Sequence, residues 1–228
     1  MPGEAFLPIA GAYPAHPPQH LLDEYTRLED KFTSLQGGAP VTAADIGTTI
    51  DTAEDLLAIH AGLDMTTPHG KDTPKRFVGM LEDLTSHKDC DGACIKWKTF
   101  TSEGDEMIVV KKIPYYSVCN HHVIPFYGFA WIGYVPNLEI AGLSKFARVV
   151  NHYARRLQVQ ERLTDEVWAY LNANLAPKGL MVVLEGEHLC MTLRGAQVPG
   201  TTTRTVKTSG VFADHSKTAK AEFLEAIR

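Results

Sequence analysis

The spacing of apolar residues changes once along this chain of 228 residues, and that change constrains the fold more than any other feature. Apolar residues recur at helical spacing over 21–35, over 43–62, and from Thr73-Pro74 to about Leu84, where Thr73 resembles an N-cap. From about residue 94 apolar and polar residues alternate, which is typical of strands. The sequence therefore predicts a helical front part followed by a sheet.

The same pattern predicts three regions. Residues 1–20 are rich in proline and have no apolar period, so we expect an extended or disordered arm there. A helical region is predicted over 21–88, with Gly37-Gly38 ending its first helix. The remaining residues, 89–228, should form a domain that contains the sheet.

The order of elements within 89–228 predicts an α+β fold. Alternation predicts strands over 94–101 and 106–113, and the apolar stretch 127–135 predicts a strand buried on both faces. One helix is predicted from Gly142 and another where Thr164 serves as N-cap. Strands in GLMVVLEG and EHLCMTLRG then complete the order β-β-α-α-β-β, an antiparallel sheet with two helices on one face. The inner faces of these helices are predicted to be Leu143, Phe146, Val150, Tyr153 and Leu157, and Val167, Trp168, Leu171 and Leu175.

The composition excludes several classes of protein. A net charge of −5 does not suggest a nucleic-acid-binding surface, so a bound anion would need a local basic cluster. No apolar run approaches the roughly 18 residues that span a membrane, and the first residues lack the basic leader of a secretory signal. We therefore expect a cytoplasmic protein, in which four cysteines are metal ligands, catalytic groups or buried thiols.

Cysteine and histidine coincide in the segments SVCNHHVIPFYG (117–128) and GEHLCMTLRG (186–195). Cys119, His122 and Cys190 offer two thiolates and one imidazole, a set that suits zinc with a fourth position open to water. A single cysteine is more often a small buried residue, but each of these has histidine neighbours. His121 should point away from His122, so His121 and His188 are available as general acid and base; the alternative is that they make structural hydrogen bonds.

The strand predicted at 187–195 has one polar face. By the side-chain period of two, that face would hold His188, Cys190, Thr192 and Arg194. The other face is apolar and would pack inward. The alternative is an edge strand with a solvated side, although cysteine is a poor choice for such a side.

The predicted helix from Gly142 begins with a basic cluster. Ser144, Lys145 and Arg148 lie around its first turn, where free backbone N–H groups and the helix dipole also favour an anion such as a phosphate chain. A solvated basic face is the alternative.

Two further pairs carry polar chemistry. Gln160 and Glu161, between the predicted helices, could read a guanine edge, which donates from N1–H and the amino group; a surface turn is the alternative. Cys90 and Cys94 have a C-x3-C spacing that suggests a second metal. Because only His87 lies nearby in the sequence, we do not predict a site there.

Taken together, several long segments resemble the GTP cyclohydrolase I family, and they occur in the family's order. They are DTPKRF (72–77), EMIVVKKIPYYSVCNHHVIPFYG, IGYVPN, GLSKFARVVNHYARRLQVQERLT, EHLCMTLRG and the closing EFLEAIR. The resemblance implies the tunnelling fold, with 89–228 as the catalytic domain, in a toroidal homodecamer of two pentamers that shares active sites between subunits. It implies zinc as cofactor and the conversion of GTP and water into formate and 7,8-dihydroneopterin triphosphate. This is the first step of tetrahydrofolate, biopterin or 7-deazapurine biosynthesis.

The resemblance also implies roles for individual residues. The implied zinc ligands are Cys119, His122 and Cys190, and the implied proton-transfer pair is His121 and His188. The implied triphosphate and ribose contacts are Ser144, Lys145, Arg148 and Arg194, with Ser144 also assisting ribose opening and Arg76 reaching the triphosphate of a neighbouring subunit. The implied guanine anchors are Gln160 and Glu161.

Two positions depart from the family pattern. Asn120 stands where the family usually has Glu between the loop cysteine and the first histidine, and Gly79 stands where many relatives have Lys. Asn cannot carry a charge or move a proton, but the implied ligands and both histidines are retained, so we expect catalysis to persist, at an altered rate or with an altered substrate range. The alternatives are therefore the same fold acting on a related purine nucleotide, or a non-catalytic oligomeric homologue.

Overall fold

The computed structural model describes residues 43–228, so the predicted arm at 1–20 and the predicted helix at 21–35 lie outside the described residues. The chain divides into two compact units between Gly62 and Leu63. In the first unit, α2 (Ala43–Ala61) confirms the helix predicted at 43–62. The second unit carries the sheet and the candidate site.

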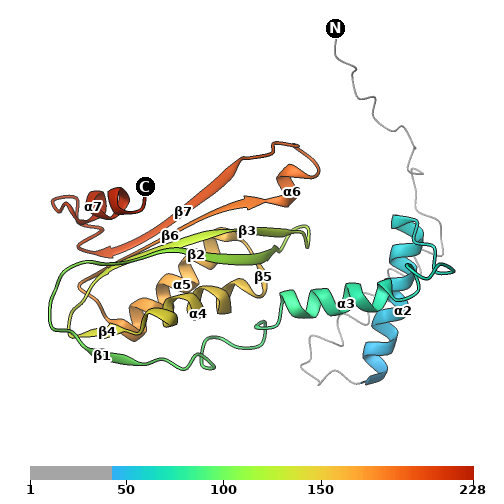
Figure 1. Ribbon diagram of the computed structural model, residues 1–228, viewed down its shortest axis with the longest axis horizontal. Coiled ribbons are helices and arrows are strands. Elements are labelled where there is room, and N and C mark those ends of the chain that lie inside the picture. The colour runs from blue at the N-terminus through green and yellow to red at the C-terminus, as the bar shows by residue number, and fades with distance from the viewer. Residues whose placement is uncertain (1–42) are drawn as a thin grey trace, which may run out of the picture. The chain divides into compact units, whose positions relative to one another are not determined.

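The second unit alternates helices and strands along the chain (Figure 1). Its elements are α3 (Thr73–Leu84), β1 (Thr99–Thr101), β2 (Ile108–Cys119), β3 (Pro125–Val135), β4 (Glu139–Ala141), α4 (Leu143–Ala154), β5 (Leu157–Gln158), α5 (Gln160–Leu175), β6 (Gly179–His188), α6 (Leu189–Thr192), β7 (Thr202–Gly210) and α7 (Ala219–Ala226). No helix in the described range has the length and apolar character needed to cross a bilayer.

Five strands form the main sheet in the order β5-β2-β3-β6-β7, and every neighbouring pair is antiparallel except β5 with β2. Helices α4 and α5 cover one face of this sheet (Figure 1). The main core lies between the helices and the sheet and includes Phe146, Val150, Leu163 and Leu171, all fully buried. The predicted α+β class, an antiparallel sheet with two helices on one face, is confirmed.

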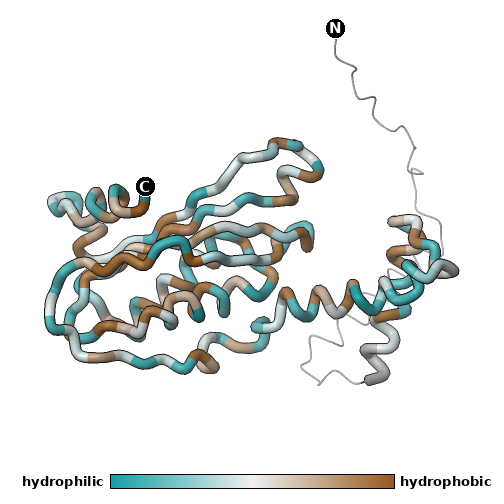
Figure 2. The backbone as a smooth tube through the Cα atoms, viewed as in Figure 1, coloured by the Kyte–Doolittle hydropathy of each residue, from teal (hydrophilic) through white to brown (hydrophobic). Residues whose placement is uncertain are grey.

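Side chains of β3 alternate between two different environments. Ala130, Ile132 and Tyr134 pack in the main core under α4 and α5. Trp131 packs on the opposite face, in a small cluster with Phe223 of α7. Figure 2 shows the apolar stretches along these central strands. The rest of the opposite face is open, because Tyr127 and Phe129 remain exposed, so the prediction that 127–135 is buried on both faces is wrong for this half of the strand.

A β-bulge in β2 decides which side of the sheet Cys119 faces. The register with β3 shifts between Val110 and Ile113, and Lys112 has a positive φ of 53°. One extra residue in a strand moves all later side chains to the other face. Val110 packs against the main core before the bulge, and Ile113, Tyr115 and Cys119 do so after it. Cys119 therefore faces the side of the sheet that the helices cover.

Two predicted helix boundaries are wrong by up to one turn. Thr164 is not an N-cap, because α5 begins at Gln160 and the Thr164 hydroxyl donates to the Gln160 carbonyl 2.8 Å away. A threonine inside a helix satisfies its hydroxyl on the carbonyl four residues earlier, so its sequence signature resembles a cap. The N-cap of α3 is Asp72 rather than Thr73.

The predicted inner face of the Gly142 helix is correct in its middle and wrong at both ends. Phe146, Val150 and Tyr153 are buried. Leu143 is 69% exposed, and Leu157 lies beyond the end of α4, where it pairs with Val118 as part of β5. Apolar spacing cannot report where a helix ends when apolar residues continue into a following strand.

The strands predicted at both ends of the domain are shorter than the alternation suggested. Of 94–101, only β1 is extended, and it pairs with β4 in a separate two-stranded sheet. At the other end the predicted strand at 187–195 is not a separate strand, because Glu187 and His188 end β6 and the next four residues form the helical turn α6. The prediction that His188, Cys190, Thr192 and Arg194 share a strand face is therefore wrong. The strand that follows is β7, which the sequence did not predict.

Candidate metal centre and surrounding site

Cys119, His122 and Cys190 meet although they come from the end of β2, the following loop and α6. Their ligand atoms all lie within 4.8 Å of one another, and Cys119 Sγ lies 3.8 Å from His122 Nδ1. Tetrahedral zinc with its usual bond lengths to sulfur and nitrogen would hold two such atoms about 3.6 Å apart. The three side chains therefore fit a tetrahedral metal with small adjustments.

A tight turn after β2 brings Cys119 and His122 together. The Cys119 N–H donates to the Ile124 carbonyl at 2.9 Å, and the Val123 N–H donates to the Cys119 carbonyl at 2.8 Å. Val123 has a φ of 53°, a left-handed conformation that closes the turn. The loop is also tied to β5, because the Asn120 N–H donates to the Gln158 carbonyl at 2.8 Å.

His121 lies as close to Cys119 as His122 does, with Nδ1 3.8 Å from Cys119 Sγ. The two rings are 6.1 Å apart and inclined at 69°, so they point in different directions. Only the His122 ring is also within reach of Cys190 in the part of the chain that the structure describes. Both histidines are equally far from Cys119, so the position of Cys190 decides that His122, and not His121, is the candidate ligand.

The Cys119 and Cys190 thiols lie next to each other, and this contact disfavours ionisation of Cys190. Cys119 and Cys190 are both free. Burial, followed by the charge and hydrogen bond of Cys119, raises the pKa of the Cys190 thiol. A divalent cation between them would reverse this effect, since metal binding favours the thiolate.

His188 lies beside this cluster in a defined orientation. Its ring stacks on Phe126 with centroids 4.5 Å apart and planes inclined at 4°. Its Nε2 lies 3.0 Å from Gln160 Oε1, so Nε2–H donates and Nδ1 keeps its lone pair. Burial lowers the pKa of His188, and the nearby Glu161 carboxylate partly opposes that shift. A neutral imidazole with a free nitrogen is suited to proton transfer.

Gln160 is buried and its amide is occupied by protein groups. It is the first residue of α5, not part of a connection between two helices as predicted. Its Nε2 donates to the Thr203 carbonyl at 2.8 Å and to Thr205 Oγ1 at 3.1 Å. Its Oε1 accepts from His188 and, at 3.4 Å, from the Tyr115 hydroxyl. Glu161, one residue later, is exposed.

Phe126 and Tyr115 were not among the predicted site residues. In the sequence each is one of the apolar or aromatic residues of a strand, which is the usual signature of a core position. Both are fully buried, and they act on the site only through His188 and Gln160. Strand alternation carries no signal that would have distinguished them.

The predicted anion cluster lies at the opposite end of α4 from the cysteine cluster. The helix begins after β4 and ends just before β5, which pairs with the last residues of β2. From Ser144 to Ala154, ten residues span roughly 15 Å of helix. Ser144 and Arg148 are exposed, and Lys145 Nζ donates to the Lys96 carbonyl. One chain therefore does not bring this cluster to the metal ligands.

The two remaining predicted arginines are exposed. Arg194 follows α6, and its charge acts to lower the pKa of Cys190, so it belongs to the surroundings of the cysteine cluster. Arg76 lies on α3 and forms an ion pair with Asp72, at 3.4 Å.

Comparison with known proteins agrees with this geometry. A family profile described as GTP cyclohydrolase I matches residues 50–228, which include every predicted site residue. The chain belongs to the GTP cyclohydrolase I family.

Relatives in the GTP cyclohydrolase I family match over most of their own length. A protein named GTP cyclohydrolase 1 from Carboxydothermus hydrogenoformans is 44% identical over 179 residues, covering 78% of this chain and 93% of that protein. One from Sulfurihydrogenibium sp. is 45% identical over 180 residues, with the same coverage. One from Synechococcus sp. is 38% identical over 204 residues, 89% of each chain.

The two positions that depart from the GTP cyclohydrolase I pattern lie in different surroundings. Asn120 is exposed on the turn that carries Cys119 and His122. Gly79 lies inside α3, and a β-carbon added to it would meet nothing within 4 Å. Neither residue is needed for the local backbone conformation, so a larger side chain fits at both positions.

Proposed function

We propose that this chain is a zinc-dependent GTP cyclohydrolase I that opens the guanine imidazole ring of GTP, releasing formate and 7,8-dihydroneopterin triphosphate. The observation that carries the proposal is the meeting of Cys119, His122 and Cys190 beside the oriented imidazole of His188. Zinc on these three ligands would supply a Lewis acid that lowers the pKa of water toward neutrality. The reaction would take place in the cytoplasm, which supplies GTP and keeps thiol ligands reduced.

The proton transfers are assigned to His121 and His188. His188 presents Nδ1 as a proton acceptor or, once protonated, as a donor, because its Nε2–H is held by Gln160. A proton delivered to N7 of guanine makes the C8–N bond easier to break after water has added at C8. His121, exposed on the turn, is close enough to the metal ligands to move a second proton.

Guanine would be held at its Watson–Crick edge by Glu161. A carboxylate can accept from both N1–H and the amino group, which fits guanine and not adenine. Gln160, also implied as a guanine anchor, has its amide engaged within the protein, so we assign it the positioning of His188. Binding the base away from the reacting carbon keeps that carbon in place through successive steps.

The triphosphate and ribose are assigned to Ser144, Lys145, Arg148, Arg194 and Arg76. Ser144 and Lys145 lie in the first turn of α4 and Arg148 in its middle, all away from the metal ligands, so we infer that a second copy of the chain completes each site. An open sheet face with exposed aromatic residues, including Tyr116 at 64% and Phe129 at 45%, supports association with another copy. A homodecamer with shared active sites, in which Arg76 reaches a neighbour's triphosphate and Ser144 assists ribose opening, fits these observations.

A single assay tests the proposal. The zinc-loaded protein is incubated with GTP, with and without a chelator, and formate and the fluorescence of oxidised neopterin are measured. We expect both products, their loss with the chelator, and their loss in His188→Ala, with His69→Gln as a matched exposed-histidine control. An intact zinc-loaded oligomer that forms neither product from GTP would contradict the proposal.

Asn120 motivates one alternative substrate class. Because Asn120 removes a carboxyl group beside two metal ligands, the chain would act on a related purine nucleotide if that carboxyl group were required for GTP. The same assay with other purine nucleoside triphosphates, on the natural protein and on Asn120→Glu, distinguishes the two. A preference for another purine that Asn120→Glu converts to GTP would favour the alternative. A non-catalytic homologue predicts that no purine nucleotide gives product.

A further inference from the structure

The Cys90–Cys94 loop meets helix α4, and the contact creates a cluster that the sequence does not reveal. Cys90 and Cys94 have few potential ligands near them in the sequence, but the fold brings His152, near the end of α4, against both. Ligand atoms of these three residues all lie within 4.8 Å of one another. This cluster is separate from the one formed by Cys119, His122 and Cys190.

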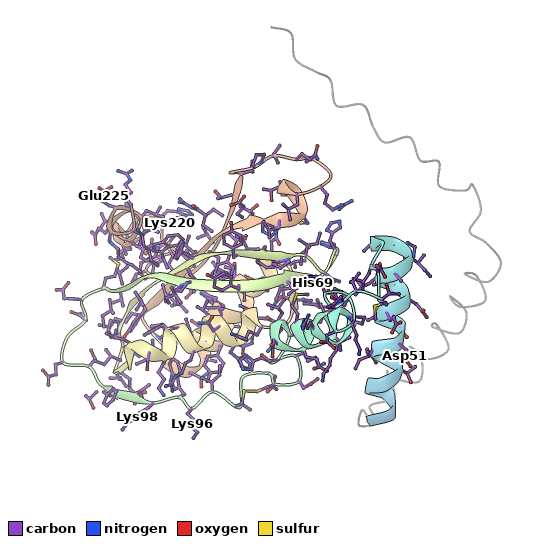
Figure 3. All side chains as sticks on the ribbon, turned by 45° about the vertical axis from the view of Figure 1, so that its right-hand side comes forward. Asp51, His69, Lys96, Lys98, Lys220 and Glu225 are labelled. Carbon is purple, nitrogen blue, oxygen red and sulfur yellow. A yellow bond between two sulfur atoms is a disulfide. The ribbon has the colours of Figure 1, made fainter. Side chains whose placement is uncertain are left out.

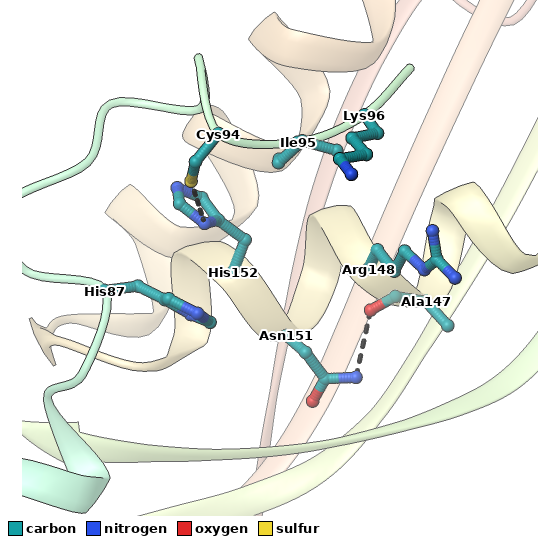
Figure 4. A pocket seen from close by; sticks show the side chains of 8 residues that line it. All are labelled: His87, Cys94, Ile95, Lys96, Ala147, Arg148, Asn151 and His152. Carbon is teal, nitrogen blue, oxygen red and sulfur yellow. Dashed lines mark hydrogen bonds between the residues drawn. The ribbon is translucent and has the colours of Figure 1, made fainter. Parts of the chain in front are cut away.

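The orientation of His152 suits a metal ligand. Its Nε2 lies 2.9 Å from the Cys90 carbonyl oxygen and 3.2 Å from Arg156 Nη2, and in the tautomer that carries its proton on Nε2 it donates to that carbonyl. Its Nδ1, which then keeps a lone pair, lies 3.6 Å from Cys94 Sγ (Figure 4). Histidines that bind metals usually donate their other ring N–H to a carbonyl or carboxylate in this way. The expected spacing of sulfur and nitrogen on tetrahedral zinc is about 3.6 Å.

His87 lies next to this cluster but outside the 4.8 Å set of ligand atoms, so its side chain would have to move to become a fourth ligand. Its ring stacks on that of His152, with centroids 4.8 Å apart and planes inclined at 28°. His87 Nδ1 is buried and has no hydrogen-bond partner among the described residues. A buried nitrogen without a partner is destabilising, and a metal ion would satisfy it. His87, Cys94 and His152 line one pocket, of about 400 Å³, with Lys96 and Arg148 at its other end (Figure 4).

The loop that carries the two cysteines is held in a single conformation. Gly92 has a φ of 106°, and a β-carbon there would lie 2.6 Å from the Tyr153 hydroxyl, so only glycine fits. The same hydroxyl donates to the Asp91 carbonyl at 3.0 Å. The Cys94 N–H points at Cys90 Sγ from 3.3 Å, a contact that favours a thiolate.

We propose that Cys90, Cys94 and His152, with His87 as fourth ligand, form a second site for zinc or a similar thiophilic divalent metal. Two thiolates and two neutral imidazoles balance the charge of Zn²⁺, and C-x3-C falls within the spacing of structural zinc sites. Four protein ligands leave no open position, so this metal would be structural. It would tie the segment between α3 and β1 to α4.

The structure shows Cys90 and Cys94 joined in a disulfide, which is the oxidised form of the same ligand pair. A phosphine reductant and water convert the disulfide into two thiols and a phosphine oxide, transferring two electrons. Zn²⁺ then displaces two protons as both sulfurs bind. Metal binding and the disulfide are therefore mutually exclusive, and the reduced cytosol favours the metal form.

The test separates the two metal sites by substitution. The full-length protein is reduced with a phosphine, its thiols are counted, and it is loaded with Zn²⁺ or Co²⁺ alone and desalted. We expect four thiols and two metals per chain in the natural protein, and one metal per chain in Cys119→Ser/Cys190→Ser and in Cys90→Ser/Cys94→Ser. The cobalt form of Cys119→Ser/Cys190→Ser should show a thiolate-to-cobalt charge-transfer band and tetrahedral d–d bands.

Single histidine substitutions then test the ligand set without removing a thiol. His87→Gln and His152→Gln, made in the Cys119→Ser/Cys190→Ser background, should weaken metal binding at least about tenfold. His69→Gln, which alters a histidine before α3 (Figure 3), should leave it unchanged. Three results would overturn the proposal: no metal in reduced Cys119→Ser/Cys190→Ser, a disulfide that resists reduction in folded protein, or equal affinity in all three histidine variants. None of these readouts depends on GTP turnover.

Discussion

Replacing Gln160 with leucine tests whether the buried amide at the start of α5 stabilises the fold and orients His188, the proposed proton-transfer residue. Leucine has a similar size but forms no hydrogen bonds. The substitution leaves the Tyr115 hydroxyl, which is fully buried, without its only described partner. It also removes the hydrogen bond that Gln160 Nε2 donates to the Thr203 carbonyl. In addition, His188 Nε2–H loses its acceptor, Gln160 Oε1.

The size of the effect follows from these contacts. Each buried polar group left without a partner costs about 1–3 kcal/mol, and the substitution affects the fully buried Tyr115 hydroxyl, the His188 imidazole and the part-buried Thr203 carbonyl. Burying leucine in place of an amide offsets about 1–2 kcal/mol of this cost. We therefore expect Gln160→Leu to lower the free energy of unfolding by about 3 kcal/mol, and turnover of GTP to fall because His188 loses its orientation.

Urea unfolding followed by tryptophan fluorescence, at one fixed chain concentration, measures this change as a shift in midpoint of about 1 M. Glu161→Gln is the matched control, because Glu161 is exposed on the same helical turn. It should change stability by less than about 1 kcal/mol but raise the KM for GTP. If Gln160→Leu unfolds at the same urea concentration as the natural protein, the assignment of Gln160 to a stabilising interior network is refuted.

Three further predictions concern other parts of the molecule. Cys190→Ala should reduce formate release at least about a hundredfold and lower zinc content by one per chain, and retention of both would exclude its role as a ligand. Gly128→Ala should lower the free energy of unfolding by at least about 3 kcal/mol, because its β-carbon would lie 1.9 Å from the Glu185 carbonyl oxygen. Gly79→Ala, in open space inside a helix, should raise it by about 0.5–1 kcal/mol. Equal effects of the two substitutions in thermal or urea unfolding would contradict the packing. Burial raises the pKa of Tyr115 and of three other tyrosines, so as pH rises the unfolded chain should lose these protons before the folded chain does. The free energy of unfolding should therefore fall above about pH 10. An unfolding free energy that stays constant between about pH 9 and 11, measured together with tyrosine absorbance, would contradict this.

Local periodicity was enough to predict much of the fold. The middle of α4, with Phe146, Val150 and Tyr153 inward, follows from apolar residues at helical spacing, because a half-buried helix must repeat with its own turn. The α+β class follows in the same way from the order in which helical spacing and strand alternation of apolar residues occur along the chain. Periodicity failed where a short polar residue or a change of element interrupts it, as at Thr164 and beyond His188. There the backbone conformation depends on contacts with other segments, which local spacing does not record.

The sequence by itself determined the residue types of the first candidate metal site, since Cys119, His122 and Cys190 stand out by chemistry alone. Only the tertiary structure decided how they meet, because the bulge at Lys112 sets the face of Cys119 and the turn at α6 brings Cys190 inward. It likewise placed Gln160 in the interior. A metal site is a set of directions and distances between segments far apart in the chain.

The Cys90–Cys94 pair is a second case in which the sequence does not show how potential ligands meet. Its C-x3-C spacing suggested a metal, but too few potential ligands lie nearby in the sequence to predict a site, because the third proposed ligand, His152, is 58 residues from Cys94. Chemistry can be recognised in a sequence only where the ligands are already suggestive by type or spacing. Where they converge through packing of a loop on a helix, only the folded chain reveals the site.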